Sequence, residues 1–168
     1  DEVFTGFGRT GRWFGFEHFG IVPDLVTFSK SLGGGKASIA GYIAKSHIFE
    51  RTYASARRCD IHSTTFGGMG EEAATAIESL NILADEDLVG RAQELGAYMA
   101  ERMQELAESH PRFIKEARCT GLLGVLEMHS ASNALGVKPI QKLLPFDELL
   151  EGLMPALVVT RLVHDHQI

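Results

Sequence analysis

Cysteine and basic residues are both scarce in this 168-residue chain. The two cysteines, Cys59 and Cys119, have neither metal-binding nor dithiol spacing, which is typical of a reducing compartment and predicts a cytoplasmic protein. Lysine and arginine together number 16 against 22 aspartates and glutamates, so we expect no nucleic-acid partner. No apolar run approaches the length of a membrane span and no signal peptide opens the chain, so we expect no membrane partner.

The residues that are abundant suit a globular enzyme. Hydrophobic residues make up 45% of the chain and charged residues 23%, which is ordinary for a soluble domain. Strand-like apolar runs alternate with stretches whose apolar residues recur at helical spacing, which predicts a layered α/β fold. An acidic run at 85–87 suits a helix start, because carboxylates cap free N–H groups there. We expect strands at 25–29, 38–44 and 122–128, helices at 12–20, 47–53, 71–83, 88–110 and 158–168, and loops at 57–70 and 130–146.

The most informative stretch is LVTFSKSLGGG at residues 25–35, where an apolar run ends in Lys30 and then in three glycines. Burying the charged amine of a lysine at the end of an apolar strand costs free energy unless the amine is neutralised, paired with an anion or bonded covalently. Desolvation favours the neutral amine, which is a nucleophile toward carbonyl compounds. Asp1 also stands at an expected strand end. An amine and a carboxylate at neighbouring strand ends are the two protein groups that a pyridoxal phosphate site needs.

Four motifs in a fixed order carry a family resemblance. They are DEVFTGFGRTG at 1–11, PD at 23–24, SKSLGGG at 29–35 and HSTTFGG at 62–68. Together they resemble the class III aminotransferases, the group of ornithine, 4-aminobutyrate and other ω-amino transaminases. The stretch 116–127 resembles the strand that begins the small domain of that family.

The resemblance implies the fold type I of pyridoxal-phosphate-dependent transferases, an α/β fold in which helices flank a mostly parallel sheet. Residues 1–110 would form the second half of the cofactor-binding large domain. Residues 111–168 would form the incomplete beginning of a small α+β domain. Because the chain starts without methionine at an expected strand end, we expect it to be an internal fragment of a longer protein.

The family also implies roles for single residues. Lys30 would be the catalytic lysine that holds pyridoxal 5'-phosphate as a Schiff base. Asp1 would face the pyridine nitrogen, and Glu2 would lie close to the site. Thr65 would bind the cofactor phosphate of the other subunit, which implies a homodimer with shared sites. Phe4, also near the site, stands where many relatives have a glutamine.

The expected reaction moves an amino group from an amine or ω-amino acid to a keto acid, often 2-oxoglutarate, through Lys30. An aminomutase or racemase of the same family is the alternative with the same chemistry. A non-catalytic truncated module is the alternative from another class of protein.

Other patterns are weaker. The GxGxxG match at 6–11 lacks both a following helix and an acidic residue about 20 positions on, so we reject a dinucleotide site. A P-loop is excluded because Lys30 occupies the place of its first glycine. His62 is interpreted as a hydrogen-bonded loop residue. His164 and His166 are interpreted as a solvated helix end and not as metal ligands.

Overall fold

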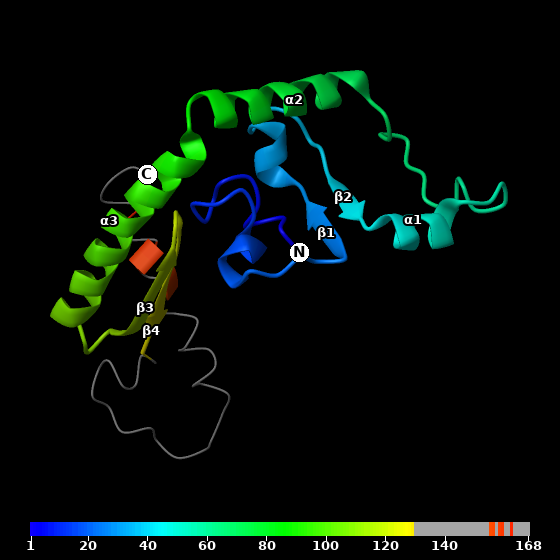
Figure 1. Ribbon diagram of the computed structural model, residues 1–168. Helices are drawn as coiled ribbons and strands as arrows, with labels where there is room; N and C mark the ends of the chain where they lie inside the picture. The colour runs from blue at the N-terminus through cyan, green and yellow to red at the C-terminus, as the bar shows by residue number, and fades with distance from the viewer. Residues whose placement is uncertain (130–154, 157, 160–161, 163–168) are drawn as a thin grey trace, which may run out of the picture. The chain divides into compact units, whose positions relative to one another are not determined.

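A computed structural model describes residues 1–129, 155–156, 158–159 and 162 (Figure 1). The expected loop at 130–146 and nearly all of the expected helix at 158–168, with His164 and His166, lie outside the described residues. The chain divides into two compact units. The first is Asp1–Ala97 with Thr120–Leu123, and the second is Tyr98–Cys119 with the residues from Gly124 onward. The division into domains near residue 110 stays a prediction.

The first unit contains a two-stranded sheet. Strand β1 (Leu25–Phe28) pairs antiparallel with β2 (Gly41–Ala44), with Leu25 opposite Ala44 and Phe28 opposite Gly41. Both strands lie inside the ranges expected from the sequence. The mostly parallel pairing expected for the sheet does not occur among the described strands of this unit. An otherwise parallel sheet commonly carries one antiparallel strand at its edge, so the observed pair is compatible with such a fold.

The helical elements of the first unit follow the predicted order. They are the 3₁₀ helices η1 (Gly15–Phe19) and η2 (Lys30–Gly33) and the α-helices α1 (Ser46–Tyr53) and α2 (Gly70–Asp85). The helix expected over 12–20 is therefore shorter and of the tighter 3₁₀ type. The loop expected over 57–70 lies between α1 and α2, as predicted.

A small aromatic core joins these elements. Phe7, Leu32 and Ala76 are buried together, and the Phe7 ring lies 5.7 Å from the Phe28 ring in an edge-on arrangement. Helix α2 packs on η2, where the Ser79 hydroxyl donates to the Ser31 carbonyl over 3.3 Å. A side chain at Gly34 would meet Ser79 Oγ at 3.2 Å, and the φ of Gly34 is +57°. The glycine run after Lys30 thus permits both the tight turn and the approach of α2.

Glu2 anchors the N-terminal segment to this core. Its side chain is buried, at 6% exposure. Its carboxylate accepts hydrogen bonds from the backbone N–H groups of Gly15 over 2.8 Å and Phe16 over 2.9 Å, and from the Thr5 hydroxyl. Its own N–H donates to the carbonyl of Thr27 in β1 over 2.8 Å. One residue therefore ties the N-terminus to both η1 and β1.

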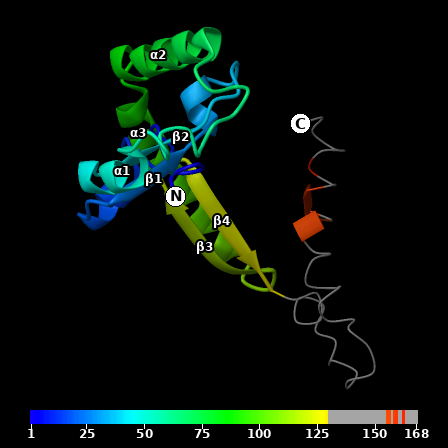
Figure 2. The same cartoon turned by 90° about the vertical axis from the view of Figure 1, so that its right-hand side faces the viewer.

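Helix α3 (Leu88–Ser109) and a β-hairpin follow along the chain. The Asp87 carboxylate accepts a hydrogen bond from the Gly90 N–H over 3.3 Å, which confirms the predicted acidic helix start. Strands β3 (Ile114–Thr120) and β4 (Leu123–Met128) lie side by side (Figure 2). The sequence predicted β4 alone. Strand β3 was missed because the polar residues of Ile114–Thr120 hide the alternation of a strand.

Large apolar side chains remain exposed in the first unit. Leu25 of β1 and Ile43 of β2 are 51% and 58% exposed, and Val22 and Phe66 are 79% and 76% exposed. Within the described part of the chain, no helix is long and apolar enough to cross a membrane.

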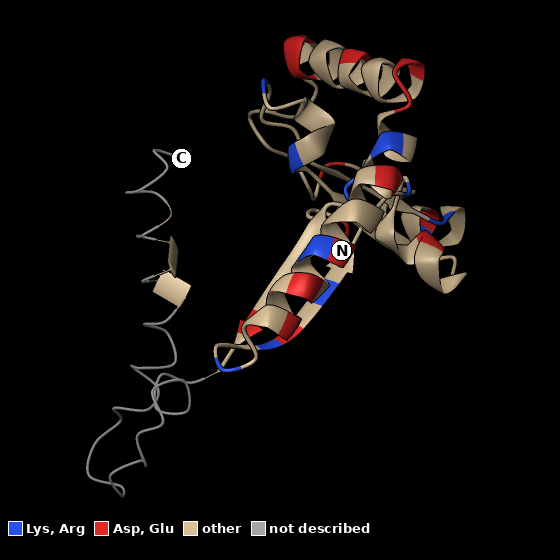
Figure 3. Ribbon diagram, turned by 90° about the vertical axis from the view of Figure 1, so that its left-hand side faces the viewer, with Lys and Arg blue, Asp and Glu red and all other residues tan. Residues whose placement is uncertain are grey.

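Charged residues of both signs lie along α3 and the hairpin (Figure 3). Lys115 of β3 forms an ion pair with Glu127 of β4, and Arg118 Nη2 lies 3.6 Å from the same carboxylate. The Lys115 ammonium lowers the pKa of Glu127 below its ordinary value of 4.5, and Glu127 raises the pKa of Lys115 above 10.5. The pair joins neighbouring strands and therefore makes the stability of the hairpin depend on pH.

We predict that Glu127→Gln lowers the free energy of unfolding at pH 7 and lowers it less at pH 3. A carboxyl whose pKa is lowered in the folded state stabilises the fold at pH values above its ordinary pKa. That contribution is lost as the pH falls through the lowered pKa. Urea unfolding at both pH values measures the difference. Glu94→Gln, at an exposed position on α3, is the control. A deficit of the same size at both pH values would contradict the prediction.

We predict that Glu2→Ala lowers the free energy of unfolding by about 2–3 kcal/mol, because two buried backbone donors lose a charged acceptor. Glu2→Gln retains an acceptor and should cost less. Urea unfolding at pH 7 measures both changes, with the exposed Glu50→Ala on α1 as the matched control. Equal stabilities of Glu2→Ala and Glu50→Ala would show that the buried hydrogen bonds contribute nothing.

Candidate active site

Asp1 lies directly before the anchored Glu2. Its side chain is exposed, and Oδ1 accepts a hydrogen bond from the Val3 N–H over 2.8 Å. Within the described residues Oδ2 has no hydrogen-bond partner, so one carboxylate oxygen is available to a ligand. Because Glu2 is bonded to Thr27, Asp1 is held near the C-terminal half of β1. The structure thus brings the segment that bears Asp1 beside β1, the strand that leads to Lys30.

Lys30 follows β1 in a strained turn. It is the first residue of η2 and its φ is +46°, in the left-handed region that non-glycine residues rarely adopt. Such a conformation costs about 1–3 kcal/mol and recurs at functional sites. The preceding Ser29 donates its hydroxyl to the Ile39 carbonyl over 2.8 Å, which holds the turn from the other side. The chain therefore maintains Lys30 in a conformation that local sterics oppose.

The burial expected of Lys30 is wrong for this chain. Its side chain is exposed, and β1 is also exposed at alternate positions. The reason is that β1 has only β2 as a hydrogen-bonded neighbour among the described strands, so no further layer covers the strand end. The candidate catalytic role of Lys30 is therefore supported by its contacts and its backbone conformation, and not by desolvation.

Phe4 is the residue that contacts Lys30. The Lys30 ammonium lies 3.7 Å from the centroid of the Phe4 ring, a cation–π contact between the N-terminal segment and η2. Within the described residues, Lys30 has no carboxylate at ion-pair distance. Phe4 itself is 62% exposed. The structure therefore joins two of the predicted site residues directly, and leaves the amine with no anionic partner.

Thr65 lies in a separate loop. It opens the turn 65–68 and is exposed, and the turn is closed by a hydrogen bond from the Gly67 N–H to the Thr64 carbonyl over 3.1 Å. Gly68 has a φ of +78°. No hydrogen bond, ion pair or ring contact among the described residues joins Thr65 to Lys30 or to Asp1. The structure therefore does not bring Thr65 into contact with Lys30 or Asp1 among the described residues.

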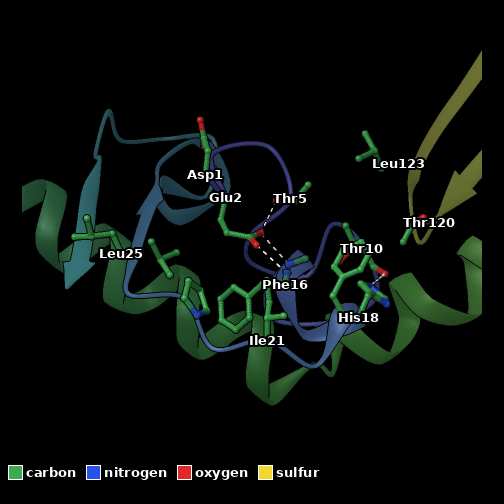
Figure 4. Close-up of a pocket in the computed structure, with 14 residues that line it drawn as sticks. Asp1, Glu2, Thr5, Thr10, Phe16, His18, Ile21, Leu25, Thr120 and Leu123 are labelled. Carbon is green, nitrogen blue, oxygen red and sulfur yellow. Dashed lines mark hydrogen bonds between the residues drawn. The ribbon is translucent and has the colours of Figure 1, made fainter. Parts of the chain in front are cut away.

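A cavity of about 640 Å³ opens beside the N-terminal segment (Figure 4). Its walls are mostly apolar and include Phe16, Ile21 and Leu25. Asp1 lines it, whereas Lys30, Phe4 and Thr65 do not. The Thr10 side chain, which also lines it, is buried, and its hydroxyl has no hydrogen-bond partner within the described part of the chain. The cavity is therefore not the place where the predicted site residues converge.

The sequence did not predict the anchoring role of Glu2 or the hydrogen-bond partner of His62. The anchoring role of Glu2 depends on N–H groups of η1 that lie 13 and 14 residues away, for which no sequence pattern exists. The hydrogen bond of His62, expected in general terms, is made to the hydroxyl of Tyr53 over 3.4 Å. Nothing in the sequence pairs these two residues.

The chain has clear relatives. The sequence model of the family described as Aminotransferase class-III matches residues 1–163. A putrescine aminotransferase of Pectobacterium atrosepticum is 34% identical over 170 residues, which cover 96% of this chain and 35% of that protein.

Solved structures agree with this match. An (S)-enantioselective omega-transaminase from Thermomicrobium roseum superimposes with a TM-score of 0.71 at 35% identity, over 77% of this chain and 28% of that one. An ornithine delta-aminotransferase structure from Plasmodium falciparum superimposes with a TM-score of 0.68 at 31% identity. The match covers 76% of this chain and 32% of that one. This chain thus spans about a third of the length of its relatives. It belongs to the class III aminotransferases, a family of pyridoxal-phosphate-dependent enzymes with fold type I.

Proposed function

We propose that the protein acts as an aminotransferase that moves an amino group from an amine or ω-amino acid to a keto acid, with Lys30 as the catalytic lysine. The observation that carries the proposal is the strained turn at Lys30, whose amine contacts Phe4 from the segment that also bears Asp1. Membership of the class III aminotransferases supports the reaction type. A relative is a putrescine aminotransferase, so a diamine is the first amino donor to test, with 2-oxoglutarate as the acceptor.

The donor set of the chain suits pyridoxal phosphate. The cofactor carries an aldehyde, a pyridine nitrogen and a phosphate, which call for an amine, a carboxylate and hydroxyl or N–H donors respectively. Lys30 offers an amine with no anionic partner among the described residues. Asp1 offers a carboxylate with one oxygen not hydrogen-bonded to the described protein, and the exposed Thr65 offers a hydroxyl on a glycine-rich turn. Each part of the cofactor therefore has a matching group.

The roles of the residues follow from their chemistry. When bound, pyridoxal phosphate supplies the electron sink for negative charge on the substrate carbon. Lys30 Nζ would hold the cofactor and, as a free amine, would accept a proton from the substrate and return it. The Asp1 carboxylate would accept a hydrogen bond from the protonated ring nitrogen, a charge-assisted contact that would contribute about 1.5–3 kcal/mol. Thr65 would donate its hydroxyl to the phosphate of the partner subunit's cofactor, so the functional unit would be a homodimer. A cytoplasmic location stays a prediction.

We expect pyridoxal phosphate followed by borohydride to label Lys30 stoichiometrically, as mapped by peptide mass spectrometry, because the strained turn and the Phe4 contact hold this amine beside the segment that bears Asp1. The labelling is done on the 168-residue chain and on any longer form of the protein. Lys30→Ala should abolish the label, while Lys36→Ala, at an exposed lysine six residues on, should leave it unchanged. Scattered labelling that includes Lys36 and Lys45, or a label that survives in Lys30→Ala, would refute the assignment.

We expect Thr65→Ala to weaken pyridoxal phosphate binding by about 10- to 100-fold, which corresponds to the loss of one hydrogen bond to a charged group. Thr64→Ala, at the neighbouring exposed hydroxyl, is the matched control and should bind normally. In a mixed dimer with one Thr65→Ala chain, a titration should find one weakened site and one normal site. Two equally weakened sites would contradict a phosphate contact across the subunits.

A further inference from the structure

Tyr42, Tyr53 and His62 form a hydrogen-bonded group, here named the Tyr–His cluster. The Tyr42 hydroxyl donates to the Tyr53 hydroxyl over 2.7 Å, and Tyr53 Oη lies 3.4 Å from His62 Nδ1. The rings of Tyr42 and His62 are stacked, with 6.3 Å between their centroids and 21° between their planes. Tyr42 belongs to β2 and Tyr53 ends α1 (Figure 1). The cluster therefore links two ordered elements to the loop that carries His62.

The loop at residues 54–69, between α1 and α2, has little else to hold it. Every residue from 56 to 70 is exposed, so apolar packing does not order this stretch. Arg58 secures the beginning of the loop, with Nη1 donating to the Arg51 carbonyl over 2.7 Å and Nε to Ser55 Oγ over 3.1 Å. Among the described residues, the turn at Thr65 is held by its internal hydrogen bond from the Gly67 N–H. His62, three residues before Thr65, is the point where a side chain ties this later part of the loop to β2 and α1.

The Tyr42 hydroxyl donates to the Tyr53 hydroxyl, which leaves the Tyr53 proton available for the hydrogen bond with His62 Nδ1. The tautomer of His62 sets which of these two residues donates. The hydrogen bond with Tyr53 also raises the pKa of Tyr42 above its ordinary value of 10. Among the described residues His62 forms no ion pair, and its hydrogen bond and its ring contact are made to the two tyrosines.

We propose that the Tyr–His cluster positions the Thr65 turn for binding a phosphate group, so that Tyr42, Tyr53 and His62 are positioning residues of the site. The proposal rests on the proposed role of Thr65 as a phosphate ligand. A phosphate contact needs its donors held in place before the ligand arrives, because ordering a loop on binding reduces affinity. A polar cluster can supply that order where the loop has no buried side chains.

The first test is amide hydrogen exchange over residues 61–69, measured by mass spectrometry in the cofactor-free protein. Tyr53→Phe and His62→Leu should both speed exchange in this segment. His62→Asn, which keeps an acceptor near the position of Nδ1, should restore much of the protection. Tyr98→Phe, at the third tyrosine of the chain, is the matched control, since Tyr98 lies on α3 and is 61% exposed. Unchanged exchange in Tyr53→Phe and His62→Leu would overturn the proposal.

The second test compares the binding of pyridoxal phosphate with that of pyridoxal, which lacks the phosphate. Tyr53→Phe should weaken the phosphate ester by about 2- to 10-fold, the range for one neutral hydrogen bond, and leave pyridoxal unchanged. Equal losses for both compounds, or no loss for either, would overturn the phosphate role. Lys30 labelling of the unmutated protein separates the two proposals. Failure to label it would refute the proposed function and the phosphate role together, whereas normal labelling with unchanged exchange would refute the cluster alone.

Discussion

The arrangement of the candidate site depends on the buried carboxylate of Glu2. A buried carboxylate is costly unless hydrogen bonds satisfy it, and here two backbone N–H groups of η1 and the Thr5 hydroxyl do so. The same residue's N–H is bonded to Thr27 of β1. Asp1 and Phe4 lie one residue before and two residues after this anchor, so their positions relative to β1 follow from it. The carboxylate predicted to bind the cofactor is therefore placed by its neighbour Glu2.

The Lys30 turn is held by packing. A left-handed residue costs about 1–3 kcal/mol, while burying a leucine side chain contributes about 1.5–3 kcal/mol. Leu32, two residues after Lys30, is 7% exposed and packs with Phe7 and with Ala76 of α2. The burial of this one side chain is large enough to offset the strain at Lys30. Helix α2, which contributes no predicted site residue, thereby helps to set the direction of the amine.

Local patterns in the sequence predicted most of the helices and strands but few of the contacts between them. The strand before Lys30, helices α1 and α2, and the start of α3 after Asp87 depend on periodicity and capping, which are encoded locally. Strand β3 escaped because Lys115, Glu116 and Arg118 obscure its alternation. The burial of Lys30 was predicted wrongly because burial depends on layers that pack from elsewhere in a fold. The partners of Glu2 in η1 and of His62 at the end of α1 could not be predicted, since hydrogen bonds between separate segments leave no periodic signal.

The groups proposed to bind the cofactor are thus held by two kinds of force. The turn at Lys30 is held by apolar packing of η2 against α2, together with the hydrogen bonds of Ser29 and Ser79. In our proposal, the hydroxyl of Thr65 depends instead on an exposed loop that is ordered by hydrogen bonds among polar side chains. The two ends of a bound pyridoxal phosphate would therefore respond differently to substitution. Changes in the core would disturb the aldehyde end, and changes among surface phenols would disturb the phosphate end. Such a division suits a site whose lysine and phosphate ligand come from different subunits, because each part must be ordered by its own chain before the two meet.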